Sequence, residues 1–180
     1  MKKVLVVHNK YQQLGGEDVA VENEIQFLKK HYKVRVLYFE NEITNYFKQI
    51  LYFILNKNIG SANLLRTTIE EFNPDLVYVH NTWFKASVSI FTILKKNKVP
   101  TLIKLHNFRY ECTRSIFISR HLKNTNKCLA CGLENKDKRY INLYFEESIL
   151  KSILVFIYGR KYFKILIKNE EIKIAVLTEF

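Results

Sequence analysis

Short apolar runs rich in β-branched residues recur along the chain between helical patterns. Each run is four to six residues long, which suits a strand and is too short for a helix. An uninterrupted apolar run is typical of a strand covered on both faces, as in a parallel sheet. We therefore predict five buried strands, at Lys3–Val7, Val34–Tyr38, Leu76–Val79, Thr101–Leu105 and Ile172–Leu177.

Between these runs, apolar residues recur at the three- and four-residue spacing of a helix face. Asn73-Pro74 and Val99-Pro100 are stop signals after two of the helices. Strand and helix in alternation indicate right-handed βαβ units. The expected fold class is α/β, with a Rossmann-like parallel sheet and helices on both faces. The apolar faces of the three predicted helices are formed by Val21, Ile25 and Leu28; by Leu65, Ile69 and Phe72; and by Ile90, Phe91 and Leu94.

Three further regions complete the expected organisation. Ile43–Asn56 is predicted to be helical with apolar residues nearly all round, which favours deep packing or contact with a membrane or partner. Asn107–Asp137 has no periodicity and holds all three cysteines, as expected of a functional or poorly ordered connection. Tyr144–Ile167 is predicted to be a long helix.

The charge of the chain is strongly positive, at +12 from 29 basic and 17 acidic residues. Half of this excess lies between Lys104 and Arg139, with nine basic and three acidic residues. Such a segment suits phosphate-bearing ligands or an anionic membrane surface, and a solvated basic surface is the alternative. Acidic residues are interleaved through most of the chain and no nucleic-acid module pattern is present, so we expect no nucleic acid partner.

The sequence favours a cytoplasmic location. The apolar run at Val4–Val7 is followed at once by polar residues, so it does not form the core of a signal peptide. The longest apolar run, Ile153–Tyr158, is far shorter than a bilayer span. Three cysteines leave at least one unpaired, which fits a reducing compartment.

Ligands of parallel α/β sheets bind beyond the carboxyl ends of the strands. After the first strand, Gly15-Gly16-Glu17 opens a helix, where backbone N–H groups and the helix dipole favour an anion; an ordinary tight turn is the alternative. The third and fourth strands are followed by His80-Asn81 and His106-Asn107. Both imidazoles can hydrogen-bond to sugar hydroxyls or phosphate oxygens.

The cysteines leave two interpretations open. Cys128-x2-Cys131 has the spacing of a zinc knuckle, and Cys112 would supply a third thiolate. His121 is the nearby candidate for a fourth ligand. Because a structural zinc site normally has four clear ligands, free thiols are the favoured interpretation.

The order of these motifs resembles the N-terminal domain of the family 4 glycosyltransferases, two-domain enzymes of the GT-B architecture. The resemblance covers the whole chain and is strongest for a bacterial subgroup. It is carried by VLVVHNKYQQLGGED at 4–18, PDLVYVHNT at 74–82, LHNFR at 105–109, the CxxC pair and AVLTEF at 175–180. It implies that residues 1–180 form one half of a GT-B fold, with an irregular basic insertion at about 107–140. The donor-binding C-terminal domain is absent from these residues.

The resemblance also implies a reaction and the residues that serve it. This domain would bind a glycan or lipid-linked acceptor, and the transferred sugar would come from a nucleotide-sugar co-substrate with retention at the anomeric carbon. His106 matches the position that commonly reaches the transferred sugar. The Gly15-Gly16 loop would approach the donor diphosphate, and Arg109 would add positive potential. No cofactor is expected to be required, and the lack of a further cysteine in Gly132–Phe145 weakens a zinc site.

Two functions follow from these expectations. The first is the acceptor-side domain of a retaining glycosyltransferase in surface-polysaccharide or glycan assembly, needing a donor-binding domain or subunit for activity. The second is a non-catalytic subunit of a split glycosyltransferase that binds a partner or makes peripheral contact with the inner face of the membrane. The apolar Ile43–Ile54 helix and the Tyr144–Ile167 helix suggest this alternative.

Overall fold

A computed structural model describes residues 1–10, 15–40, 46–55, 57–83, 85–106, 112–113, 115–123, 125–128, 134, 140–144 and 148–176. The chain forms two compact units. The first unit comprises residues 1–106 and 169–180, and the second comprises residues 107–168. The second unit thus extends past the expected insertion end near residue 140, because it includes a long helix.

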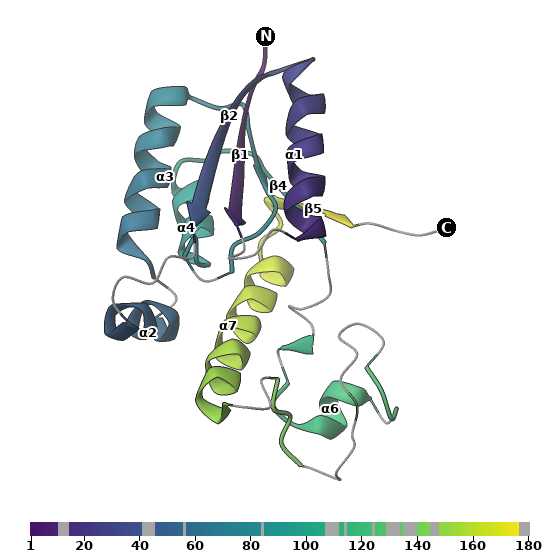
Figure 1. The fold of residues 1–180 in the computed structure, drawn as a ribbon. Helices are drawn as coiled ribbons and strands as arrows, with labels where there is room; N and C mark the ends of the chain where they lie inside the picture. Colours follow the sequence, from purple (N-terminus) through teal and green to yellow (C-terminus); the bar gives the residue numbers. More distant parts are fainter. Residues whose placement is uncertain are drawn as a thin grey trace. The chain divides into compact units, whose positions relative to one another are not determined.

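The first unit is an α/β fold built on a five-stranded, all-parallel sheet (Figure 1). Its order is β2-β1-β3-β4-β5, so the direction of strand addition reverses between β1 and β3. The strands are β1 (Lys3–Lys10), β2 (Lys33–Glu40), β3 (Leu76–Val79), β4 (Thr101–Leu105) and β5 (Ile172–Val176). All five predicted strands are present, and the predicted Rossmann-like fold class is confirmed.

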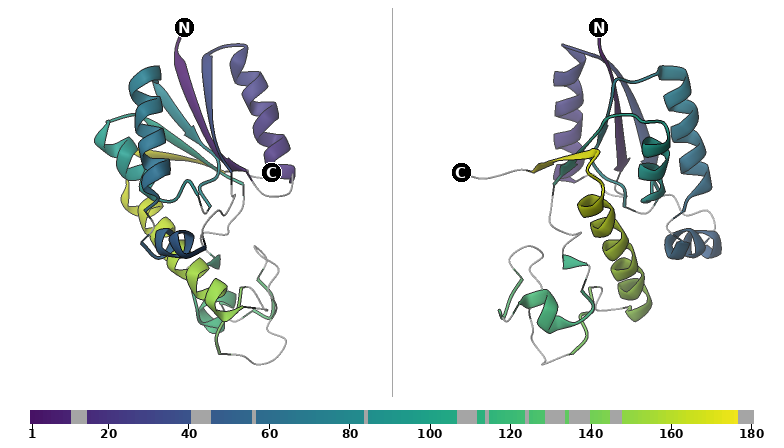
Figure 2. Two further views of the ribbon diagram at one scale, coloured as in Figure 1. Left: turned by 60° about the vertical axis from the view of Figure 1, so that its left-hand side comes forward. Right: turned by 180° about the vertical axis from the view of Figure 1, so that it is seen from behind.

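Helices cover both faces of this sheet, with α1 on one side and α3 and α4 on the other (Figures 1 and 2). Val21 and Ile25 of α1 pack with Val4 and Val6 of β1. On the opposite face, α3 and α4 contribute their buried apolar residues. The helices of this unit are α1 (Gly16–Lys29), α2 (Tyr46–Leu55), α3 (Ile59–Phe72) and α4 (Ser89–Lys96).

Capping residues fix where the helices begin and end. Asn58 accepts a hydrogen bond from the backbone N–H of Ser61 and so caps the start of α3. Asn73 ends the same helix in the left-handed conformation, at φ 48°, directly before Pro74. The Asn73-Pro74 stop signal therefore works as predicted.

The edge strands differ from the expectation of uniform burial. In β2 the exposed and partly buried positions alternate, and in β5 the side chains of Ile174 and Val176 are 44% and 48% exposed. The prediction of full burial is wrong for these two strands, because each has a neighbouring strand on one side only. The central strands β1, β3 and β4 are the buried ones.

The second unit holds two described helices, α6 (Ile118–Leu122) and α7 (Ile149–Lys168). The predicted long helix is present but begins at Ile149, five residues after Tyr144. Gly159 of α7 packs tightly on Thr113, since an ideal Cβ at this glycine would lie 2.1 Å from the Thr113 hydroxyl oxygen. Within the described residues, neither α7 nor any other helix has the length and apolar character needed to cross a membrane.

Candidate functional site

Three histidines gather at the carboxyl end of the sheet. His8 lies near the end of β1, and His80 and His106 directly follow β3 and β4. Their ring centroids are 6.1 Å apart for His8 and His80, and 5.2 Å apart for His80 and His106. Since β1 and β3 flank the reversal of strand order, the cluster occupies the topological switch point, where open α/β sheets bind ligands.

The most accessible of these rings is hydrogen-bonded to a second ring that faces a carboxylate. Nε2 of His106 lies 2.9 Å from Nδ1 of His80. Nε2 of His80 has no hydrogen-bond partner among the described residues and lies 4.0 Å from Oε2 of Glu24, too far for a hydrogen bond. The negative charge of Glu24 favours an N–H over a lone pair on the nitrogen that faces it, so we assign the proton of His80 to Nε2. Nδ1 of His80 then accepts from the Nε2–H of His106. His106 is thereby left with a lone pair on Nδ1, which can accept a hydrogen bond from a hydroxyl group.

Glu24 anchors this row from the apolar face of α1. Its carboxylate accepts a hydrogen bond from the ammonium of Lys104 and another, at 2.8 Å, from the hydroxyl of Tyr78. Burial alone would raise the pKa of Glu24, but these two hydrogen bonds outweigh it and the pKa lies below its ordinary value. Glu24 is therefore ionised at neutral pH, and Lys104 balances its charge.

The three imidazoles are neutral at pH 7. Burial lowers the pKa of His80 to about 3, even though the nearby Glu24 carboxylate opposes the shift. The pKa of His106 is lowered by burial and by the charge of Lys104. Burial also lowers the pKa of His8, against the opposing effect of Asp18. A neutral His106 can therefore offer hydrogen bonds to a ligand but no charge of its own.

His8 ties the cluster to the start of α1. Its Nε2 lies 2.8 Å from Oδ1 of Asp18, while Oδ2 of Asp18 accepts a hydrogen bond from the backbone N–H of Gly15 at 3.0 Å. Asp18, at position N3, thus forms one half of a capping box at the helix N-terminus, because Gly15 has no side chain for the reciprocal bond. An ideal Cβ at Gly16 would meet nothing within 4 Å. The backbone at Gly16 is therefore open to approach by a ligand, as the sequence predicted for an anion.

Two asparagines lock the loops that follow β1 and β3. The side-chain amide of Asn81 donates to the backbone oxygen of Asn9 at 3.0 Å and accepts from the backbone N–H of Trp83 at 3.0 Å. The side-chain oxygen of Asn9 accepts from the backbone N–H of Ala86. Both asparagines are buried. The polar atoms of Asn81 thus hold the loops in place, and a ligand contact by its side chain remains a prediction.

The structure brings His80 and His106 together, as predicted. The predicted Gly15-Gly16 turn is connected to this cluster by Asp18, which contacts both His8 and Gly15. Glu17 is half-buried in the first turn of α1. Asn107 and Arg109 lie outside the described residues. Sequence reasoning missed Asp18 and Glu24, although both share the helix face of Val21 and Ile25. An acidic residue at an apolar position of a helix was the available signal.

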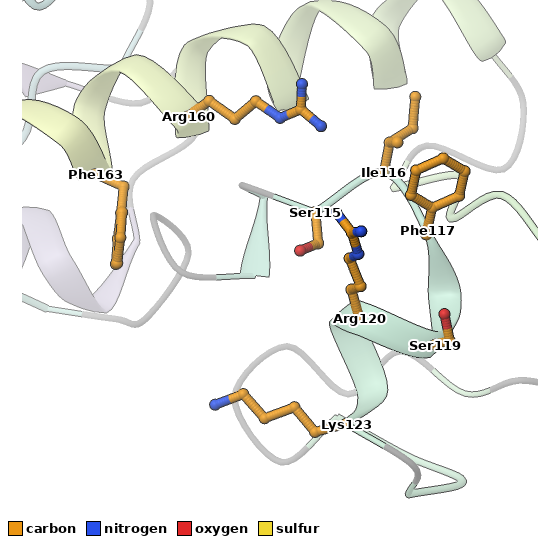
Figure 3. Close-up of a pocket in the computed structure, with 8 residues that line it drawn as sticks. All are labelled: Ser115, Ile116, Phe117, Ser119, Arg120, Lys123, Arg160 and Phe163. Carbon is orange, nitrogen blue, oxygen red and sulfur yellow. The ribbon is translucent and has the colours of Figure 1, made fainter.

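The predicted cysteine group is partly assembled in the second unit. Cys112, Cys128 and His121 place their ligand atoms within 4.8 Å of one another. Cys131 lies outside the described residues. The second unit also contains a basic pocket of about 520 Å³ (Figure 3).

Arg120 and Lys123 in this pocket come from the basic segment that the sequence associated with phosphate-bearing ligands, whereas Arg160 of α7 was not foreseen. In Figure 3 the guanidinium groups of Arg120 and Arg160 both point toward Ser115. The lining residues are Ser115, Ile116, Phe117, Ser119, Arg120, Lys123, Arg160 and Phe163.

No protein-family model and no curated protein matches the sequence. Among solved structures, the chain is similar to a GDP-L-fucose synthetase from Naegleria fowleri, with 14% sequence identity and a TM-score of 0.41. The match covers 97% of this chain and 48% of that chain, so this chain spans about half the length of the matched protein. A similarity this low carries no functional argument, and the function must be inferred from the site and the motifs.

Proposed function

We propose that this chain is the acceptor-side domain of a retaining glycosyltransferase that uses a nucleotide sugar in surface-polysaccharide or glycan synthesis. The observation that carries the proposal is the meeting of His8, His80 and His106 at the switch point of the sheet. The order of motifs along the sequence, which resembles the family 4 enzymes, adds the reaction class. Neutral imidazoles can donate to and accept from the hydroxyl groups of a polyhydroxylated ligand, which supports this proposal.

In this proposal His106 meets the transferred sugar. Its Nδ1 accepts a hydrogen bond from a sugar hydroxyl, while His80 and Glu24 fix the ring and its tautomer. Such a contact contributes by orientation, which is a large part of catalysis when two substrates must meet. The open backbone at Gly16, at the N-terminus of α1, faces the donor diphosphate and stabilises its negative charge.

The reaction needs groups that bind the nucleotide sugar from the other side, and in the proposed enzyme these belong to a donor-binding domain or subunit. The test is to co-express the chain with a GT-B donor-binding domain and to measure transfer of radiolabelled sugar from a panel of nucleotide sugars to host membrane lipids. We expect transfer by the pair only, a loss of at least ~100-fold in His106→Ala, and full activity in His31→Ala, whose ring is exposed.

Two outcomes would overturn the proposal. One is turnover by the 180-residue chain alone at the rate of the complete pair. The other is transfer by the pair that His106→Ala leaves unchanged. Circular dichroism of each variant separates a lost contact from a lost fold.

A second candidate function is a non-catalytic subunit of a split glycosyltransferase, and α2 is the observation that favours it. Five apolar side chains of this ten-residue helix are exposed, among them Phe47 at 89% and Leu51 at 52%. The other three are Ile50, Ile54 and Leu55. Flotation with anionic liposomes and pull-down from the native host test this function. A monomeric chain that binds neither argues against it.

A further inference from the structure

Three side chains with metal-binding atoms converge in the second unit. The sulfur atoms of Cys112 and Cys128 are 3.5 Å apart. One ring nitrogen of His121 lies within 4.8 Å of both sulfurs. Cys112 and His121 are 5% and 7% exposed, whereas Cys128 is only half-buried. Cys112 and His121 are therefore shielded from solvent, and the group is accessible to solvent at Cys128.

The spacing of the sulfurs distinguishes between a disulfide and a metal site. A disulfide holds its sulfurs at about 2.05 Å, well short of the 3.5 Å between Cys112 and Cys128. Two thiolates bound to one zinc ion at about 2.3 Å and at the tetrahedral angle lie about 3.8 Å apart. The observed distance excludes a disulfide. It fits both a hydrogen bond between two thiols and, to within a few tenths of an ångström, two thiolates on one zinc ion.

His121 is held in the orientation that a ligand needs. Its Nδ1 lies 2.6 Å from the side-chain amide of Asn142, which is fully buried. Asn142 is held by the bridge between Phe117 and Ile141, and its backbone N–H donates to the backbone oxygen of Ile116. Metal-binding histidines characteristically use their second nitrogen for such a contact, which fixes ring and tautomer.

The amide of Asn142 can serve the metal-binding tautomer. Its Oδ1 has no hydrogen-bond partner within the part of the chain that the structure describes. Exchanging the positions of the amide oxygen and nitrogen lets Oδ1 accept a hydrogen bond from Nδ1–H of His121. The lone pair then lies on Nε2. In the absence of metal the ring also hydrogen-bonds to the backbone of Cys112, which keeps it close to the first cysteine. Because a neutral imidazole has one proton, a zinc ion on the other nitrogen would replace one of these two hydrogen bonds.

We propose that Cys112, His121 and Cys128 supply three ligands of a zinc ion in the second unit, with a water molecule in the fourth position of the tetrahedron. Thiolate sulfur and imidazole nitrogen are the ligands that zinc prefers, and two thiolates balance the charge of the ion. From the sequence alone, His121 was only a nearby candidate and free thiols were favoured. The structure places His121, nine residues after Cys112, against both sulfurs.

Zinc has a physical task in this unit. The described part of the segment between residues 107 and 148 contains little regular structure beyond the five-residue helix α6. A bound ion would link three parts of this segment: Cys112 before α6, His121 within α6 and Cys128 after α6. Because binding energy at such a site becomes folding energy, loss of the ion should loosen this segment.

The test is metal binding by the purified, reduced 180-residue chain. We expect one zinc per chain by elemental analysis. We also expect that Co²⁺ added to the metal-free protein gives a thiolate charge-transfer band in the near ultraviolet and intense tetrahedral bands in the visible. Competition with a chromophoric chelator should show at least ~100-fold weaker zinc binding in Cys112→Ser, Cys128→Ser and His121→Gln, and ~10- to 100-fold weaker binding in Asn142→Ala. His31→Gln is the matched control and should bind like the parent.

Three results would overturn the proposal, and the first two need no variant to fold. The first is a reduced parent chain that takes up no stoichiometric zinc or gives a cobalt spectrum without thiolate bands. The second is a disulfide between Cys112 and Cys128, found by mass spectrometry in protein isolated under reducing conditions. The third is a His121→Gln variant that binds zinc with the affinity and the cobalt spectrum of the parent.

Discussion

Acidification should destabilise the first unit well above the pH at which its carboxylates titrate. The buried ring of His80 stays neutral in the folded chain, with a pKa of about 3, against an ordinary value of 6.5. Between these values the unfolded chain binds a proton that the folded chain does not. Stability from this group is therefore complete above pH 6.5 and is lost progressively as the pH falls toward 3.

The size of the effect follows from the two pKa values. A pKa difference of one unit corresponds to about 1.4 kcal/mol, so His80 alone should remove about 2 kcal/mol of the free energy of unfolding between pH 7 and pH 5. His8 and His106 shift in the same direction and add to this loss. Glu22 and Glu24 have lowered pKa values, so their contribution is lost only below their ordinary value of 4.5. The window from pH 7 to 5 therefore isolates the histidines.

The assay is urea unfolding followed by the fluorescence of Trp83. It is the only tryptophan in the sequence, and it is buried in the first unit beside the cluster. With an ordinary urea dependence of about 2 kcal/mol per molar, the midpoint should fall by about 1 M between pH 7 and pH 5. The midpoint of His80→Gln should change less between pH 7 and pH 5 than the midpoint of the parent, and His31→Gln should behave like the parent. Two results would refute the assignment of a neutral buried His80. One is a urea midpoint of the parent chain that does not change between pH 7 and pH 5, and the other is a change in His80→Gln as large as that of the parent.

Three further predictions concern packing, charge and the glycine turn. Gly159→Ala should lower the melting temperature, although alanine favours the helix by about 1 kcal/mol over glycine. Its Cβ would lie 2.8 Å from the backbone of Thr113, and such overpacking costs about 1–3 kcal/mol. A higher melting temperature would contradict this prediction. Lys104→Met should destabilise the chain by about 1–3 kcal/mol in urea unfolding by leaving Glu24 without its cation, and adding Glu24→Gln should recover part of the loss. Gly16→Ala should change stability by less than about 0.5 kcal/mol, since its Cβ meets nothing, while transfer by the complemented enzyme falls; unchanged transfer would exclude close approach of the diphosphate.

Much of the fold could be predicted because its signals are local. The bounds of β3 and β4 match the predicted strands residue for residue. Both strands are short apolar runs that begin just after a proline, and each has a neighbouring strand on both sides. Because the ligands of parallel sheets bind beyond the carboxyl ends of the strands, the sequence alone also places His80 and His106 at one edge of the sheet.

The interactions that set the chemistry of the site are not local. Glu24 reaches Lys104 across 80 positions of sequence and Tyr78 across 54. The pattern of apolar and polar residues cannot predict such pairs. It indicates only that a carboxylate on the apolar face of α1, such as that of Glu24, needs a partner where it is buried. His121 shows the same limit. Its spacing to either cysteine resembles no common zinc motif, and only folding around Asn142 brings it to the sulfurs.

The central claim is that neutral His106, held by His80 and Glu24, presents the Nδ1 lone pair to a sugar hydroxyl. The direct measurement is the imidazole ¹⁵N spectrum of the chain at pH 7, recorded before and after addition of nucleotide sugars and membrane glycolipids. The account predicts that His106 and His80 each carry one proton, on Nε2, and that a bound sugar moves the Nδ1 signal of His106 before any signal of His31. A doubly protonated His106, a proton on its Nδ1, or ligands that leave its signals unmoved would contradict the account.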